Sequence, residues 1–353
     1  MSQPIAQATY GADQAGLIAG FRFASGQAGT EIDSAQALQW LQKHSDAEAA
    51  GNDRANASND DDEFLWLHFN LAHVACERWM HNHLGLPDAF FQALREGSSS
   101  TRIEHIDNVL LAVINDVAFS FGMVSSDIAT MWACANHRVL ITARAKPLRS
   151  VDQLREAVKR RERFHSPLAL LVHLLEDQAD VLLHIVRETS GKVDGIEDRL
   201  LAQRVNDNRA ELAAMRRTLV RLQRLLAPEP GSLFRLLNRP PAWLQEEDVK
   251  ALRESTEAFS LVLNDLTALV ERIRLVQEEL AAQLNEQTNR TLFTLTMVTV
   301  LALPINIVAG FFGMNVGGIP MANHPHGFWI LVALVASFTV LAGRWAFRKQ
   351  SQF

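Results

Sequence analysis

The chain has 353 residues, with 34 Lys or Arg, 40 Asp or Glu and a formal net charge of −6. This mild charge, without a basic stripe that carries interleaved aromatic residues, argues against a nucleic-acid partner. The only two cysteines, Cys76 and Cys134, lack CxxC spacing, so we expect neither a disulfide framework nor a cysteine zinc site, and a reducing compartment is favoured.

Residues 1–150 carry short apolar runs separated by turn and cap signals, which predicts a cytosolic α/β domain. β-Branched and aromatic residues predict strands at 17–24, 64–70, 109–114, 128–133 and 139–143. Helices are predicted at 71–83 and 87–95, the second with a proline in its first turn. The start of the chain lacks the basic end and apolar run of a signal peptide.

Long helices are predicted in residues 151–290. Ser166 and Pro167 form a cap and proline start for a helix that should run to about Ala227, where prolines at 228 and 230 follow. Gly191 and Gly195 are candidate interruptions of this helix.

A second long helix should begin near Glu246 and meet no proline or glycine before Pro304. Eleven of its residues recur at spacings of three and four, and nine of them are apolar, which predicts a narrow, coiled-coil-like seam. The preceding helix repeats this spacing and is its expected packing partner. The seam comprises Val249, Leu252, Thr256, Phe259, Leu263, Leu266, Val270, Ile273, Gln277, Leu280 and Leu284, and the partner positions are Leu212, Met215, Leu219, Leu222 and Leu226.

Residues 291–343 include no Asp, Glu, Lys or Arg, which predicts an integral membrane protein. Two apolar spans, 292–312 and 328–347, are separated by fifteen residues and should form a hairpin in the third part of the chain, residues 291–353. Arg290, Arg344, Arg348 and Lys349 flank the outer ends of the spans, while the loop between them has no basic residue. The positive-inside rule therefore places both termini in the cytoplasm.

One stripe of the first span is polar. Counting by three and four from Asn285 places three asparagines and two threonines on it, because it continues through Asn289, Leu292, Thr296, Thr299, Leu303, Asn306 and Gly310. Asparagine inside hydrocarbon must face protein or water. The stripe therefore either joins neighbouring helices through hydrogen bonds or lines a pore. Because two helices cannot enclose a channel, a pore requires a homo-oligomer.

The triplet Gly313-Met314-Asn315 directly follows this span and is preceded by Phe311-Phe312. In that setting it resembles the GMN signature of the CorA superfamily of divalent-cation transporters. The resemblance covers the whole chain and implies an α/β N-terminal domain, stalk helices and a membrane hairpin, assembled as a homopentameric funnel. It also implies that Asn315 binds the incoming ion through its hydration water, while Gly313 and Met314 hold the turn and the polar stripe lines the path.

The loop that follows, Val316-Gly317-Gly318-Ile319-Pro320, resembles that of the zinc-transporting ZntB branch. Magnesium-type members commonly carry a carboxylate here, whereas this loop has none and its two glycines permit a tight turn. The resemblance implies proton-coupled zinc uptake across the bacterial cytoplasmic (inner) membrane, with Zn²⁺ as cargo and no cofactor.

Other candidate groups lie near the expected path. His324 and His326 in the outer loop either concentrate zinc or are solvated side chains. Glu278, Glu279 and Glu286 either form acidic rings around the path or pair with nearby arginines. Leu292 and Leu303 are the expected narrow points, where apolar rings would gate by dewetting.

Two other functions stay open at this point. One is a CorA-type magnesium or cobalt channel, and the other is a membrane-tethered scaffold or sensor without transport. The chain has no phosphate-binding glycine loop, GxSxG or HExxH motif, so we do not expect an enzyme.

Overall fold

The computed structural model describes residues 11–24, 27–49, 63–97, 101–106, 108–118, 128–202, 208–314, 318, 320 and 324–350, with backbone alone at 45–49 and 345–350. The chain forms two compact units, Met1–Leu275 and Val276–Phe353. The boundary between the units falls inside one continuous helix, α8 (Glu246–Gly313). The expected domain limits at residues 150 and 290 stay predictions.

A seven-stranded sheet, in the order β2-β1-β3-β7-β6-β5-β4, forms the centre of the first unit. Only β3 and β7 pair in parallel, and all other neighbours are antiparallel. The five predicted strands are confirmed to within a few residues, and the sheet adds short edge strands at both sides. The strands are β1 (Leu17–Phe23), β2 (Thr30–Glu31), β3 (Phe64–Asn70), β4 (Arg102–Ile106), β5 (Val109–Val117), β6 (Ile128–Ala135) and β7 (Val139–Arg144).

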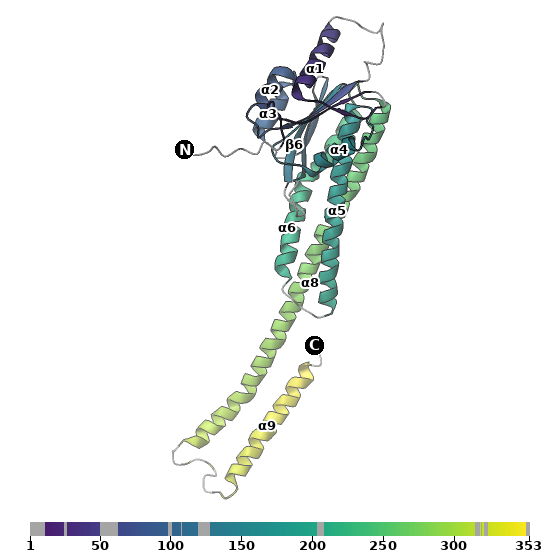
Figure 1. The fold of residues 1–353 in the computed structure, drawn as a ribbon. Helices are drawn as coiled ribbons and strands as arrows, with labels where there is room; N and C mark the ends of the chain where they lie inside the picture. The colour runs from purple at the N-terminus through teal and green to yellow at the C-terminus, as the bar shows by residue number, and fades with distance from the viewer. Residues whose placement is uncertain are drawn as a thin grey trace, which may run out of the picture. The chain divides into compact units, whose positions relative to one another are not determined.

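Helices cover both faces of the sheet, which gives the predicted α/β domain (Figure 1). One face packs on α1 (Ser34–Ala49), α2 (Cys76–His83) and α3 (Asp88–Glu96). The other packs on α4 (Arg149–Lys159), the start of α5 (Pro167–Leu201), α7 (Pro228–Asn238) and the first turns of α8. Side chains alternate along each strand, so Trp66 enters one core while Leu65 and Leu67 enter the other.

The helix predicted from Pro167 to Ala227 is wrong in its length. α5 ends at Leu201, and α6 (Arg209–Leu226) begins after Asn208. The two glycines do not interrupt α5, because Val193 and Ile196 continue its buried face across them and offset the roughly 1 kcal/mol cost of each glycine. Pro228 does not end helical structure either, since it occupies the first turn of α7, where its missing N–H costs nothing.

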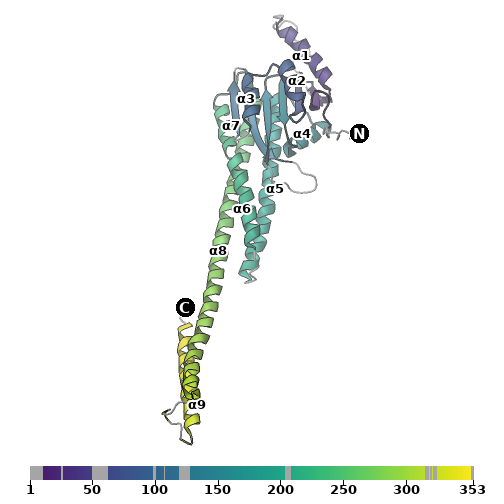
Figure 2. The ribbon, with the colours of Figure 1, turned by 90° about the vertical axis from the view of Figure 1, so that its left-hand side faces the viewer.

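The predicted seam on α8 is confirmed through the first unit. Leu252, Phe259, Leu266 and Ile273 are buried, and α5 and α6 lie beside this part of α8 in both Figure 1 and Figure 2. Leu212, Leu219, Leu222 and Leu226 of α6 are buried as expected. The seam is broader than a strict coiled-coil stripe, because Val262 and Leu269 are buried as well.

The second unit consists of the rest of α8 and of α9 (Gly327–Gln350). These two helices are long and apolar enough to cross a membrane, by length and composition. Pro304 lies inside α8 without ending it. The two helices run in opposite directions, as a hairpin requires (Figure 1).

Candidate ion pathway

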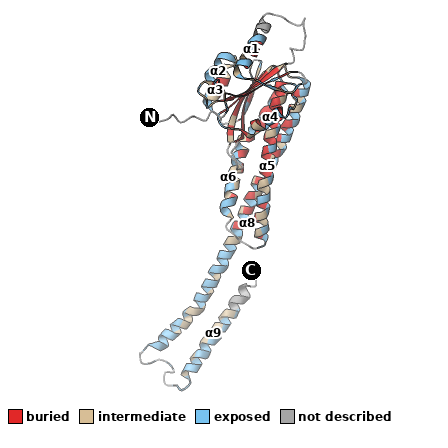
Figure 3. Cartoon of the chain, viewed as in Figure 1, coloured by how far each residue is buried: buried red, intermediate tan, exposed pale blue. Residues whose placement is uncertain are grey.

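The predicted polar stripe is exposed along the whole membrane part of α8. Leu292 and Leu303 are 54% and 58% exposed, and the other members are exposed as well. Figure 3 shows the contrast with the first unit, where buried residues gather on the sheet and the helices that cover it. The stripe consists of Asn289, Leu292, Thr296, Thr299, Leu303, Asn306 and Gly310.

A different stripe of α8 is partly buried within the hairpin. Phe293, Met297, Leu301, Ile305 and Val308 have intermediate exposure and recur every three or four residues. On α9, Leu331, Val335 and Thr339 recur in the same way. These largely apolar stripes are the less exposed faces of the two helices, whereas the polar stripe of α8 is open to water, lipid or another molecule.

The two threonines of the stripe present their oxygens as hydrogen-bond acceptors. Thr296 Oγ1 donates its proton to the carbonyl of Leu292 at 2.8 Å, and Thr299 Oγ1 donates to that of Leu295 at 2.9 Å. Because each hydroxyl has one proton, the remaining lone pairs can only accept. Water molecules around a cation direct their hydrogens outward, so this surface suits a hydrated cation.

The signature triplet lies at the end of this helix. Gly313 is the last residue of α8, and Met314 follows it and is 49% exposed. Asn315, Val316, Gly317 and Ile319 lie outside the described residues, so the ion-binding role of Asn315 stays a prediction. Gly318 has φ +93°, a conformation that favours glycine and agrees with the predicted turn.

His324 and His326 are exposed at the start of α9. Their ring centroids lie 6.1 Å apart, and Nδ1 of His324 accepts a hydrogen bond from the backbone N–H of His326 at 3.2 Å. Among the described residues, no three His, Cys, Asp or Glu side chains come together to hold a metal ion. The zinc role of this pair therefore stays a prediction.

One of the candidate acidic residues before the first span is paired with an arginine. Glu286 pairs with Arg290 at 2.7 Å, which agrees with the simpler of the two sequence interpretations. Arg272 instead joins α8 to α5, where it pairs with Glu197 and with Asp194 at 2.6 Å. These α5 carboxylates hold the pKa of Arg272 above its usual value.

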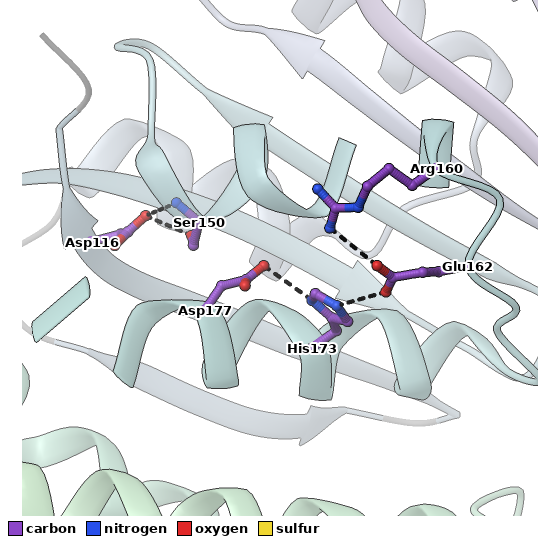
Figure 4. Close-up of polar contacts among 6 residues, drawn as sticks. All are labelled: Asp116, Ser150, Arg160, Glu162, His173 and Asp177. Carbon is purple, nitrogen blue, oxygen red and sulfur yellow. Dashed lines mark hydrogen bonds and ion pairs between the residues drawn. The ribbon is translucent and has the colours of Figure 1, made fainter. Parts of the chain in front are cut away.

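A polar cluster that sequence patterns did not indicate joins α5 to the segment that follows α4 (Figure 4). His173 on α5 contacts Asp177 at 3.0 Å and Glu162 at 3.3 Å, and Arg160 pairs with Glu162 at 3.0 Å. The hydrogen bond to Asp177 is the main cause that raises the pKa of His173.

Two buried carboxyl groups lie in the same region. Asp116 at the end of β5 accepts hydrogen bonds from the backbone and hydroxyl of Ser150, and burial raises its pKa to about 6. Glu229 on α7 is fully buried, and burial raises its pKa to about 8. The one sequence signal for Asp116 is a carboxylate inside an apolar strand; Glu229 has no comparable signal.

Comparisons with known proteins agree with this arrangement. A family model described as CorA-like Mg²⁺ transporter protein matches residues 61–349. The divalent cation transporter CmaX of Pseudomonas aeruginosa is 29% identical over 293 residues, which are 82% of this chain and 87% of that protein. The zinc transport protein ZntB of Pectobacterium atrosepticum is 26% identical over 274 residues, which are 76% of this chain and 84% of the relative.

Solved structures share the fold. The structure of full-length CmaX has a TM-score of 0.77 at 26% identity, and the match covers 95% of this chain and 98% of that one. The CorA magnesium transporter from Methanocaldococcus jannaschii has a TM-score of 0.69 at 18% identity, with 92% and 96% of the two chains covered. The arrangement of an α/β domain, a long helix and a C-terminal apolar helix is common to all three.

Proposed function

The chain belongs to the family of CorA-like Mg²⁺ transporter proteins, and from this membership we propose that it is a zinc transporter of the bacterial cytoplasmic membrane. It is a membrane protein and a divalent cation transporter. Zinc as the cargo, uptake as the direction and coupling to protons are the finer parts of the proposal, supported by the ZntB relatives and by the carboxylate-free loop after Asn315.

The exposed polar stripe on α8 carries the proposal. Asn306 lies at membrane depth, where an unpaired amide costs several kcal/mol, about 4–8 in a purely apolar solvent. The hairpin leaves this amide exposed, so a second molecule or water must meet it. Several copies around one axis would place every stripe residue in a ring around water, and a homopentamer is the assembly that we propose.

The orientation follows from charge. Arg290 precedes the first span and Arg344 lies near the end of the second, so both termini would face the cytoplasm. The α/β domain would then be cytosolic, and the loop with Asn315, His324 and His326 would face the outside. No catalytic role is proposed, because the polar stripe and the family point to transport alone.

Flux in proteoliposomes tests the cargo and the coupling. The purified full-length protein should carry Zn²⁺ into vesicles, faster with an imposed proton gradient than without one. Magnesium or cobalt flux with no zinc flux would replace the proposal with a CorA-type channel. No flux of any divalent cation would leave the tethered scaffold or sensor.

The variant Asn315→Ala tests the path. We expect it to lose most of the zinc flux while the oligomer stays assembled. Asn238→Ala is the matched control, because it removes an exposed amide at the end of α7, far along the chain from the spans, and it should leave the flux unchanged. Undiminished flux in Asn315→Ala would contradict ion entry through the signature loop.

A further inference from the structure

Glu229 lies in the first turn of α7 and is completely buried. Its Oε2 accepts a hydrogen bond from Gln178 Nε2 at 3.2 Å, whereas its Oε1 has no hydrogen-bond partner. None of the ion pairs recorded between described residues includes Glu229. A carboxylate in this position would be a buried charge without a cation, while a neutral carboxylic acid would lack only one hydrogen bond.

The hydrogen bonds around Glu229 hold the junction of α6 and α7 to the sheet. The Gln178 amide that donates to Glu229 also donates to the backbone carbonyl of Asn115 on β5, at 2.7 Å. Thr101, just before β4, donates to the carbonyl of Leu225 in the last turn of α6 at 3.3 Å. Asn115 Nδ2 donates a hydrogen bond to Thr101 Oγ1 at 3.4 Å. This bond links the Gln178–Asn115 contact to the Thr101–Leu225 contact.

Asp116 is the titratable group whose charge acts on Glu229. It is buried, and its two carboxylate oxygens accept hydrogen bonds from Val117 and Ser150. The charge of Asp177 on α5 acts in turn on Asp116, and Asp177 pairs with His173 at 3.0 Å, the contact drawn in Figure 4. Gln178 on α5 is the hydrogen-bond partner of Glu229 from a neighbouring element. On α7 itself, the charged side chain of Arg235 donates a hydrogen bond to Ser232.

The two carboxyl groups reach different states at neutral pH. Burial raises the pKa of Asp116 to about 6 and that of Glu229 to about 8, so Asp116 is charged and Glu229 is neutral at pH 7. A second negative charge is opposed by burial and by the charge on Asp116.

We propose that Glu229 is a proton-binding group that holds α7 against the sheet, and that loss of its proton to solvent water releases the α6–α7 junction. The O–H bond of the carboxyl group breaks, and the proton leaves as the junction opens. Leu233, Leu236 and Leu237 of α7 then lose their place in the core, and α7 directly precedes the start of α8. Cytosolic pH thereby acts on the segment that leads into the pore helix. This inference does not depend on which cation is carried.

The pH window follows from proton linkage. The pKa of Glu229 is about 8 in the folded junction and has its ordinary value of 4.5 in the open one. Between these two pH values the folded junction keeps the proton and the open junction loses it. Opening is therefore favoured as pH rises through this window and levels off above it. Titration of Asp116 changes the opening equilibrium mainly below about pH 6. Measurements between pH 6.5 and 7.5 therefore report mainly the titration of Glu229.

Hydrogen exchange of the full-length protein in detergent measures this opening. After correction for the intrinsic rate, the opening equilibrium of the amides in α7 should rise close to tenfold between pH 6.5 and 7.5. The amides of α3, on the opposite face of the sheet, serve as an internal reference. The variant Glu229→Gln should abolish the rise, and Glu211→Gln, at an exposed position on α6, should keep it.

Infrared spectroscopy gives a second measurement that needs no exchange. At pH 7 the wild-type protein should show a protonated-carboxyl C=O band that Glu229→Gln lacks and Glu211→Gln retains. Absence of this band in the wild type, or an α7 opening equilibrium that is constant with pH, would overturn the proposal even if Glu229→Gln failed to fold. A pH-dependent rise that persists in a folded Glu229→Gln variant would overturn it too.

Discussion

Two stretches of the helix α8 have similar apolar spacing but different surroundings. In the first unit Leu252, Phe259 and Leu266 are buried by their own chain, whereas in the second unit Leu295 and Val298 are 63% and 59% exposed. The first stretch thus obtains its packing within one chain. The second has the composition of a membrane span, and its own chain leaves most of its surface exposed, so its packing must come from lipid or from other molecules.

The largest expected effect lies in the stretch that packs within its own chain. Leu266→Ala removes a fully buried side chain from the seam and should cost about 2–5 kcal/mol. Leu261→Ala, at a position that is 66% exposed on the same helix, should cost much less. Thermal unfolding of the full-length protein measures both, and equal losses would contradict the assigned burial.

In the membrane stretch the corresponding effect is on transport. Asn306→Leu removes the amide at membrane depth and should lower zinc flux at least about tenfold, a change equivalent to roughly 1.4 kcal/mol. Ile307→Val changes the next exposed position, outside the stripe, and should leave flux nearly unchanged. If the two variants behaved alike in assembled oligomers, the stripe would not line the path.

The third effect concerns the first unit and depends on pH. The pKa of His173 is raised by Asp177, so its contribution to stability is complete below about pH 6.5 and is lost as pH rises through the higher folded pKa. His173→Gln should therefore be less stable than wild type at pH 6 and nearly equal at high pH, by under about 1 kcal/mol. Thermal unfolding at both pH values measures the difference, and a deficit that does not vary with pH would exclude titration of His173 as its cause.

The smallest effect is expected at the ion pairs between α5 and α8. Arg272 and its partners are partly exposed, so Arg272→Gln should cost about 0.2–0.5 kcal/mol, with a smaller cost at high salt. The i,i+3 pair of Arg274 and Glu271 is the matched control, and Arg274→Gln should cost less. Unfolding at low and high ionic strength measures both, and a cost of Arg272→Gln that is independent of salt would contradict an ionic origin.

Central elements of the fold were predictable because their signals are local. The long apolar runs of β3, β5 and β7 and the spacing along α8 follow directly from burial on strands and helices. The edge strand β4 (Arg102–Ile106) was missed because its five residues are mostly polar. The end of α5 was missed because the glycines looked like stronger breaks than the Asn206-Asp207-Asn208 run that precedes α6.

The candidate site was predictable to a different extent in each region. The stripe from Asn289 to Gly310 follows from helical spacing, and its role as the lining of a path stays a prediction. In the proposed homo-oligomer the same stripe residues of each copy would line the pore, but the number and the arrangement of the copies do not follow from local sequence patterns. Asp116 and Glu229 were not predictable as neighbours, because they are brought together only by the packing of α7 on the sheet.

Pro304 has a mechanical consequence for the membrane helix. Proline has no N–H to donate to the carbonyl of Val300, so α8 lacks one backbone hydrogen bond here. Pro304 lies on the chain between Leu303 and Asn306 of the polar stripe. A helix bends most easily where such a bond is already missing. A bend of α8 at Pro304 would therefore change the direction of the segment that leads to the signature triplet and leave the turns before Pro304 in place.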